Sequence, residues 1–363
     1  MAPTSVPERP TEVRSVSIDF GLVRDPQTDW EAVDRRLDEA GATGVEINAG
    51  RVEFTGFDWD AYPDAAAEPG TDHIARAISA LEQTADGSPR TIGLIVDAFV
   101  PNFIAEDPSR AGLAADGRRG EANPSATQLA RGEVGDRLVA YVAALGERYA
   151  PTQIAVTEVF LDTFSFGADD LALFQEMTGE TDWPRTPTGE PDEQSEVIGR
   201  WRTEVVQGLL ERMRTALDEV RGGEGAEIDL ALEVRIDWAD PARGQLSAGQ
   251  GYATLLTAAD RLVLWAYIYP GHTPAEIEQV TSALADAGYD MSRFTISVGL
   301  WAPGNPDPPG VLPAATMGEA VVEAETNGVT DVNVTPYTLL TDPYWAELAR
   351  VWGGAGSSGS ATP

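Results

Sequence analysis

Residues 154–162 read Ile-Ala-Val-Thr-Glu-Val-Phe-Leu-Asp, and Thr-Phe-Ser-Phe-Gly follows them. A short apolar, β-branched run that ends in an acidic residue is typical of a buried parallel strand. Because side chains alternate along a strand, we expect Glu158, Phe160 and Asp162 to share one face. Enzymes of the α/β class keep their reacting groups at this carboxyl end of the strands. The stretch therefore predicts an acidic functional site in an α/β protein.

Strand-like segments alternate with helical ones along the rest of the chain. The other strand-like segments cover residues 13–21, 44–48, 91–99, 228–237, 261–269, 294–301 and 330–337. Helical spacing of apolar residues falls at 30–40, 72–84, 132–149, 193–220, 274–287, 316–326 and 344–351. This alternation predicts a parallel sheet. Closing eight strands into a (β/α)8 TIM barrel removes both sheet edges, so we expect that fold, with loop insertions at its C-terminal face.

A single large domain accommodates this pattern. We expect residues 13–352 to form the barrel, between a Pro-rich disordered segment, 1–12, and a flexible Gly/Ser-rich tail, 353–363. Residues 100–128 interrupt the alternation with Pro, Gly and Asp. An insertion of this kind normally forms a lid or a binding loop, which we therefore expect here.

The composition is strongly acidic. The net charge is -34, and all 25 basic residues are arginine. Such a surface repels nucleic acid and anionic membranes, so we expect neither as a partner. The chain has no cysteine, which excludes disulfides and thiol chemistry. Its two histidines, His73 and His272, lie away from the strand ends. We therefore expect no cofactor and no zinc or iron centre, and a carboxylate-held magnesium or calcium site stays open.

The sequence offers no membrane or export signal. No apolar run has the length that spans a bilayer, and the first ten residues lack the layout of a signal peptide. We therefore expect a cytoplasmic protein from the sequence as written, or a secreted one if this is a mature or trimmed form. The oligomeric state is left open.

Acidic and aromatic residues gather at the predicted strand ends. The acidic ones are Asp19, Glu46, Asp97, Glu158, Asp162, Glu233 and Asp237. The aromatic ones near them are Trp59, Trp183, Trp238, Trp265, Tyr267, Tyr269, Trp301 and Tyr337. Sugars present polar edges and apolar C–H faces, which carboxylates and flat rings recognise. The combination therefore predicts a carbohydrate site, although a single aromatic residue more often belongs to the core than to a binding surface.

Cleavage of a glycosidic bond requires two carboxyl groups, one protonated and one ionised. We expect Asp162 and Glu233 to supply them, with Glu158 and Asp237 in reserve. Contacts to the substrate are expected from Asp19, Glu46, Asp97, Glu158, Arg235, Asp237, Trp265, Tyr267, Trp301 and Tyr337. A structural alternative for Glu158 is an ion pair with Arg235 deep in the barrel.

A family resemblance rests on several motifs in a fixed order. They are Val-Phe-Leu-Asp at 159–162 with aromatic residues after it, an insertion, Trp-Arg at 201–202 opening a long helix, an acid-tipped fifth strand, and Asp-Arg-Leu-Val-Leu-Trp-Ala-Tyr at 260–267. This order resembles the bacterial glycosyl-hydrolase-like TIM barrels, which are similar to exopolysaccharide hydrolases acting on amino-sugar polymers. The resemblance covers about residues 90–345 and implies a polysaccharide hydrolase with Asp162 and Glu233 in its site. Thr163 stands where that group usually has a second acid.

Two other functions remain open at this stage. Residues 44–48, Gly-Val-Glu-Ile-Asn, are similar to the second strand of the xylose-isomerase-like barrels, which implies a metal-dependent sugar isomerase or epimerase. That function needs Glu, Asp and His ligands on the rim, and the scarcity of histidine at strand ends argues against it. The other alternative is a carbohydrate-binding barrel without catalytic activity.

Overall fold

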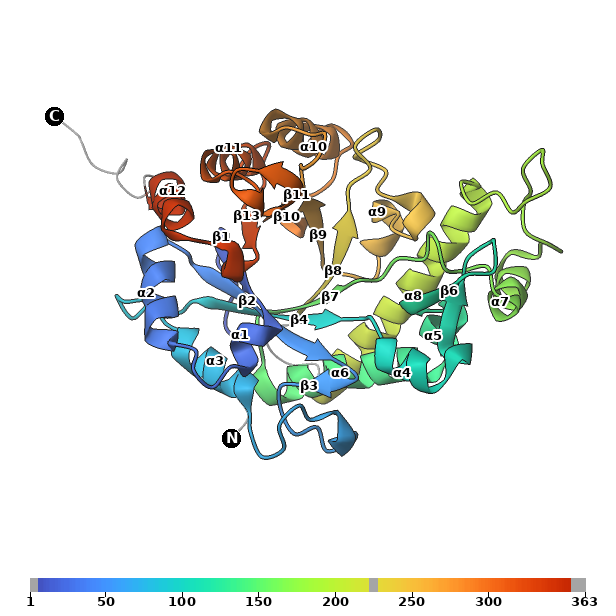
Figure 1. Ribbon diagram of the computed structural model, residues 1–363, viewed down its shortest axis with the longest axis horizontal. Coiled ribbons are helices and arrows are strands. Elements are labelled where there is room, and N and C mark those ends of the chain that lie inside the picture. The colour runs from blue at the N-terminus through green and yellow to red at the C-terminus, as the bar shows by residue number, and fades with distance from the viewer. Residues whose placement is uncertain (1–5, 222–227, 354–363) are drawn as a thin grey trace.

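Eight parallel strands close into a barrel in the computed structural model, which describes residues 6–221 and 228–353 (Figure 1). In order around the barrel they are β1 (Val13–Ile18), β2 (Gly44–Arg51), β4 (Thr91–Asp97), β7 (Gln153–Thr157), β8 (Asp229–Arg235), β9 (Arg261–Ala266), β10 (Phe294–Gly299) and β13 (Asp331–Thr335). Strand β1 closes the sheet because it pairs in parallel with both β13 and β2. The predicted (β/α)8 TIM barrel is therefore confirmed.

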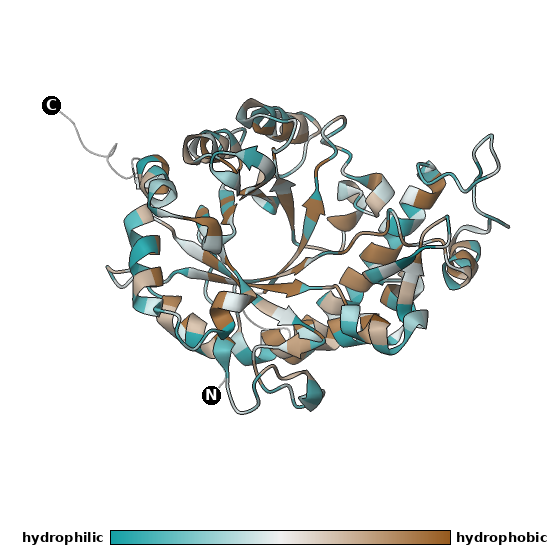
Figure 2. Ribbon diagram, in the orientation of Figure 1, coloured by the Kyte–Doolittle hydropathy of each residue, from teal (hydrophilic) through white to brown (hydrophobic). Residues whose placement is uncertain are grey.

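Helices surround the barrel and cover its outer face (Figure 1). They are α2 (Trp30–Ala40), α3 (His73–Leu81), α6 (Glu133–Tyr149), α8 (Glu196–Arg221), α9 (Tyr252–Leu255), α10 (Pro274–Asp286), α11 (Ala314–Ala324) and α12 (Asp342–Gly353). Figure 2 shows apolar residues concentrated on the strands and hydrophilic ones on the outward surfaces of the helices, which is the pattern of one shared core. None of the helices in the described ranges is both long and apolar enough to cross a bilayer.

The insertion at residues 100–128 is more regular than its sequence indicates. It contains α4 (Pro101–Glu106), η2 (Pro108–Arg110), the hairpin of β5 (Ala111–Leu113) and β6 (Arg119–Pro124), and the start of α5 (Ala126–Arg131). Its Pro and Ser residues begin helices: Pro101 opens α4, and the Ser125 side chain caps α5 by accepting from Gln128 N. The insertion is therefore built from short regular elements, and its role as a lid or binding loop stays a prediction.

The remaining short elements connect strands to helices at both ends of the barrel. They are α1 (Phe20–Arg24), β3 (Phe54–Thr55), η1 (Pro63–Ala65), α7 (Ala168–Thr178), η3 (Leu246–Ala248), η4 (Met291–Arg293), β11 (Trp301–Pro306), β12 (Pro309–Val311) and η5 (Tyr337–Leu339). Of these, β11 and β12 pair as an antiparallel hairpin directly after β10. The Asn305 side chain stabilises its turn, since Nδ2 donates to the carbonyls of Pro308 and Val311.

Buried ion pairs close the amino end of the barrel. Asp331 and Arg261 are the first residues of β13 and β9, and Arg261 Nη1 lies 2.9 Å from Asp331 Oδ2. Arg9 Nη2 donates to the same oxygen at 2.5 Å. Residues 6–12 were expected to be disordered, yet this contact and the burial of Val6 tie them to the barrel. The rest of the predicted segments, 1–5 and 354–363, lies outside the described residues.

The alternation of side chains along the strands determines which polar residues face inward at the carboxyl end of the barrel. A small apolar layer fills the middle of the barrel, and it consists of Ile95, Ala155, Ala231 and Val263. Two residues later on the same four strands come Asp97, Thr157, Glu233 and Trp265. Because side chains on one face recur every two residues, this second set faces the space above the apolar layer.

Candidate active site

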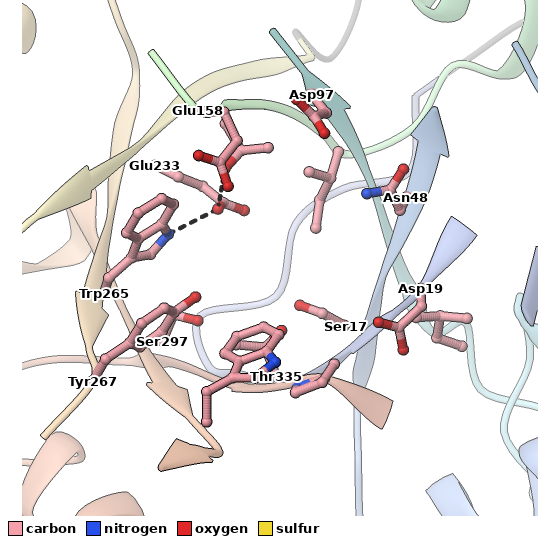
Figure 3. A pocket seen from close by; sticks show the side chains of 15 residues that line it. Ser17, Asp19, Asn48, Asp97, Glu158, Glu233, Trp265, Tyr267, Ser297 and Thr335 are labelled. Carbon is pink, nitrogen blue, oxygen red and sulfur yellow. Dashed lines mark hydrogen bonds between the residues drawn. The ribbon is translucent and has the colours of Figure 1, made fainter. Parts of the chain in front are cut away.

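A cavity of about 460 Å³ opens at the carboxyl end of the barrel strands (Figure 3). Of the residues that the sequence predicted for the site, the cavity is lined by Asp19, Asp97, Glu158, Glu233, Trp265, Tyr267 and Trp301. The structure thus brings together acidic and aromatic side chains from strands that are far apart in the sequence. This is the end of the barrel where enzymes of this fold carry their sites.

Glu233 is a partly buried carboxylate held by two hydrogen bonds (Figure 3). Its Oε2 accepts from Thr157 Oγ1 at 2.7 Å and from Trp265 Nε1 at 2.8 Å. Burial raises the pKa of Glu233, while the two hydrogen bonds act in the opposite direction because they favour the ionised form. The donors also fix which way the carboxylate points.

Glu158 reaches the cavity through an unusual backbone conformation. It is the first residue after β7 and has a φ of 63°, in the left-handed region that residues other than glycine rarely adopt. Burial, followed by the charges of Asp97 and Glu233, raises the pKa of Glu158 to about 7, and Arg235 and Arg51 lower it. Its carboxyl group therefore keeps a proton up to nearly neutral pH.

Asp97 is a third carboxylate in the cavity, and it is already paired. Arg51 Nε donates to its Oδ2 at 2.7 Å, and Phe99 N donates to Oδ1 at 2.8 Å. Burial is the largest influence on the pKa of Asp97 and raises it, against the effects of these two donors. Asp97 thus adds a fixed acidic group that favours a protonated Glu158.

Three aromatic rings form a wall of the cavity. Trp265 and Tyr267 stack with ring centres 5.4 Å apart and an interplanar angle of 5°, and Trp301 lies 5.4 Å from Tyr267 at 52°. Gly299 makes room for this arrangement, since a Cβ at that position would lie 2.2 Å from the Tyr267 ring. Trp301 is 43% exposed and extends the wall to the surface. Flat rings of this kind bind the apolar faces of sugars.

Asp162 does not line the cavity. Strand β7 ends at Thr157, so Glu158, Phe160 and Asp162 do not alternate along a strand, and the expectation that they share one face was wrong. The left-handed turn at Glu158 redirects the chain, and Asp162 Oδ2 instead accepts from Arg235 Nη1 at 2.8 Å. Arg235 therefore pairs with Asp162, whereas the sequence had suggested Glu158 as its partner.

Other predicted site residues also lie elsewhere. Glu46 is buried near the amino end of the barrel and accepts from Gln153 Nε2 at 3.3 Å. Asp237 accepts from the backbone of Ala239 in the turn after β8. Tyr337 packs on Trp345 outside the cavity. None of these residues is part of the cavity lining in the described chain, and neither is Arg235.

Several small polar residues of the site were missed from the sequence. They are Ser17, Asn48, Thr157, Ser297 and Thr335. Ser17 on β1 and Ser297 on β10, the two strands that flank β13, both donate to Asn333 Oδ1, at 3.0 and 2.9 Å. Serine and threonine are common in strands, so their presence alone does not predict a site. Their spacing of two residues from other inward-facing side chains could have predicted that they face the cavity.

No three His, Asp or Glu side chains of the described ranges are grouped so that they could hold a metal ion.

Comparison with known proteins identifies the fold at low sequence identity. No protein-family model matches the chain, and no curated protein does. The glycoside hydrolase domain of PgaB (BpsB) from Bordetella bronchiseptica is similar with a TM-score of 0.68 and 14% identity, over 94% of this chain and 99% of that one. A catalytic mutant of a GH42 β-galactosidase from G. stearothermophilus gives 0.68 and 12%, over 97% of this chain and 58% of that one. The β-amylase catalytic domain from Paenibacillus polymyxa gives 0.61 and 10%, over 94% and 98%.

These similarities confirm the resemblance to glycosyl-hydrolase-like TIM barrels at the level of the fold. The chain spans just over half the length of the β-galactosidase chain, and nearly all of the PgaB domain.

Proposed function

We propose that the protein is a glycoside hydrolase that cleaves a poly- or oligosaccharide with Glu158 and Glu233 as its two carboxyl groups. The observation that carries the proposal is that one cavity receives two glutamates with opposite environments. Glu158 has a pKa raised to about 7 and no hydrogen bond that would favour its ionised form among the described residues, while Glu233 accepts two. Glycosidases need this difference, because one carboxyl donates a proton while the other is charged.

Each glutamate has a distinct task in this mechanism. Glu158 donates its proton to the glycosidic oxygen as the bond to the anomeric carbon breaks, so the leaving sugar departs as an alcohol. Glu233, oriented by Thr157 and Trp265, faces the positive charge that develops on the other sugar, either as nucleophile or as base toward a water molecule. Asp97 favours the protonated form of Glu158 before the reaction.

The aromatic wall supplies the binding surface. Trp265 and Tyr267 present stacked rings beside Glu233, and Trp301 continues the wall outward. Asp19, which accepts from Thr338 Oγ1 at 2.9 Å, offers a fixed acceptor for sugar hydroxyls on the opposite side of the cavity (Figure 3). The similarity to glycoside hydrolases in fold supports the same class of substrate.

The proposal is tested with Glu158→Gln and Glu233→Gln. The release of reducing ends from a panel of bacterial polysaccharides identifies a substrate for the wild type, and each variant should then lose at least ~100-fold in kcat. Calorimetric titration with the same glycan should show binding retained. A wild type that binds glycans without releasing reducing ends would instead be a binding barrel, and chelator-sensitive interconversion of free sugars without release of reducing ends would favour the isomerase alternative.

A further inference from the structure

Asp162 and Arg235 form an ion pair that borders the candidate active site without lining it. Arg235 Nη1 donates to Asp162 Oδ2 at 2.8 Å, and the guanidinium carbon lies 3.9 Å from the centre of the Phe160 ring. The pair is partly shielded, with side chains 36% and 31% exposed. Partial burial and stacking on a ring make such a pair better defined than an exposed one.

The backbone on both sides of the pair is anchored. Arg202 Nη2 donates to the Asp162 carbonyl at 3.1 Å. Arg235 N donates to Gln250 Oε1 at 2.9 Å, and Tyr252 OH donates to the Arg235 carbonyl at 2.8 Å. The backbone of both residues is therefore fixed, and the Arg235 guanidinium is held in place by Asp162 and by the Phe160 ring.

Two cations act on Glu158, and each has a carboxylate of its own. Arg51 on β2 is paired with Asp97 on β4, and Arg235 on β8 is paired with Asp162. The other groups that interact with Glu158 are the carboxylates of Asp97 on β4 and Glu233 on β8, and the neutral phenol of Tyr267 beyond β9. Any loss of a carboxylate partner would leave a free guanidinium beside Glu158.

We propose that Asp162 is a positioning residue, which holds the Arg235 guanidinium on Phe160 and prevents it from pairing with Glu158. This role rests on the proposed function, in which Glu158 must keep its proton. The contact between Arg235 and Phe160 also supports Glu233. Phe160 packs edge-on against Trp265, with 5.9 Å between the ring centres, and Trp265 donates a hydrogen bond to Glu233. Asp162 thus acts on both glutamates through its neighbours and does not touch the substrate.

The test follows the titration of Glu158 directly. The side-chain carboxyl carbons are observed by ¹³C NMR as a function of pH, and the Glu158→Gln variant assigns the resonance. In Asp162→Asn the freed guanidinium should lower the titration midpoint of Glu158 by about one pH unit, because an opposite charge within reach favours the ionised form. Arg235→Gln should raise the midpoint, and the double variant should behave like Arg235→Gln alone.

Asp136→Asn is the matched control. It removes a carboxylate from another arginine pair, with Arg212 at 2.5 Å on the outer helices, and should leave the Glu158 midpoint unchanged. Circular dichroism of all variants checks that they fold.

Activity adds a second readout. Asp162→Asn should move the alkaline limb of the kcat/KM profile to lower pH and keep most of kcat at its optimum. An unchanged Glu158 midpoint together with loss of kcat at every pH would overturn the proposal and make Asp162 a catalytic residue. If no variant cleaves any glycan but the midpoints shift as stated, the positioning role stands and the hydrolase function fails.

Discussion

For a single residue such as Glu233, hydrogen bonds favour the ionised carboxylate against the burial that raises its pKa. Thr157 lies on the strand next to Glu233 and its hydroxyl donates to the carboxylate at 2.7 Å. Thr157→Val keeps the shape of the side chain and removes this donor. The ionised form loses a stabilising contact, so the pKa of Glu233 rises further and the acidic limb of the kcat/KM profile moves to higher pH. A hydrogen bond to a charged group corresponds to a shift of about one pH unit.

A pH–rate profile of Thr157→Val measures this shift, and Thr295→Val is its control. The Thr295 hydroxyl is buried in the same barrel and has no partner in the described chain, so its loss removes no hydrogen bond. If both variants give the wild-type acidic limb, Glu233 is not the group that must be ionised.

The types of residue at the cavity could be predicted from the sequence, but the backbone conformation that directs their side chains could not. Glu233 and Trp265 line the cavity, because period-two alternation within a regular strand fixes where they point. Asp162 was assigned by extending the same alternation past Thr157, where the strand has already ended. The left-handed conformation of Glu158 decides that outcome, and no residue type in the sequence signals it.

At the scale of elements, helix α8 holds the loop between β7 and α7 through one buried side chain. Arg202 is fully buried in α8. Its guanidinium donates to Ser165 Oγ at 2.9 Å and to the carbonyls of Ser247 at 2.6 Å, Glu193 at 3.3 Å and Asp162 at 3.1 Å. Burial lowers the pKa of Arg202 to about 10, which leaves it charged at neutral pH. The guanidinium of Arg202 therefore connects α8 to three loops, those that contain Asp162, Glu193 and Ser247.

Arg202→Lys should release the loop of residues 159–167, because one ammonium cannot reach all these acceptors. We expect a loss of about 3 kcal/mol in the free energy of unfolding and faster hydrogen exchange in that loop. Arg200→Lys on the same helix, where the side chain is 60% exposed, should change neither. Equal exchange in the two variants would mean that Arg202 does not hold the loop.

The elements themselves were predictable to different degrees. Helices and strands of the barrel follow from apolar periodicity because each has one face against the core; α2, for example, has the predicted bounds. The hairpins β5–β6 and β11–β12 were missed because their residues, such as the Pro and Gly of 301–311, do not bury a continuous face.

For the molecule as a whole, the barrel could be predicted by counting strand and helix units, whereas the burial of its carboxyl groups away from the cavity could not. Glu46 in the barrel and Asp170 on α7 are buried, Glu158 at the cavity is partly buried, and burial raises the pKa of each to about 7. The folded chain therefore binds more protons than the unfolded chain between the ordinary carboxyl pKa and about pH 7. Stability should fall as the pH rises through that interval.

Glu46 allows this dependence to be tested, since it lies away from the cavity and is buried. Desolvation, opposed by Arg9, raises its pKa from 4.5 to about 7, so ionising Glu46 above that pH costs the folded state roughly 3 kcal/mol. Glu46→Gln should remove this cost: urea unfolding should show it more stable than the wild type near pH 8 and nearly equal near pH 5. Glu39→Gln, an exposed change on α2, should alter neither value. If Glu46→Gln is instead less stable near pH 8, the charge of Glu46 helps to hold Arg9 and Arg261 at the base of the barrel, and the fall in stability with pH must come from Glu158 and Asp170.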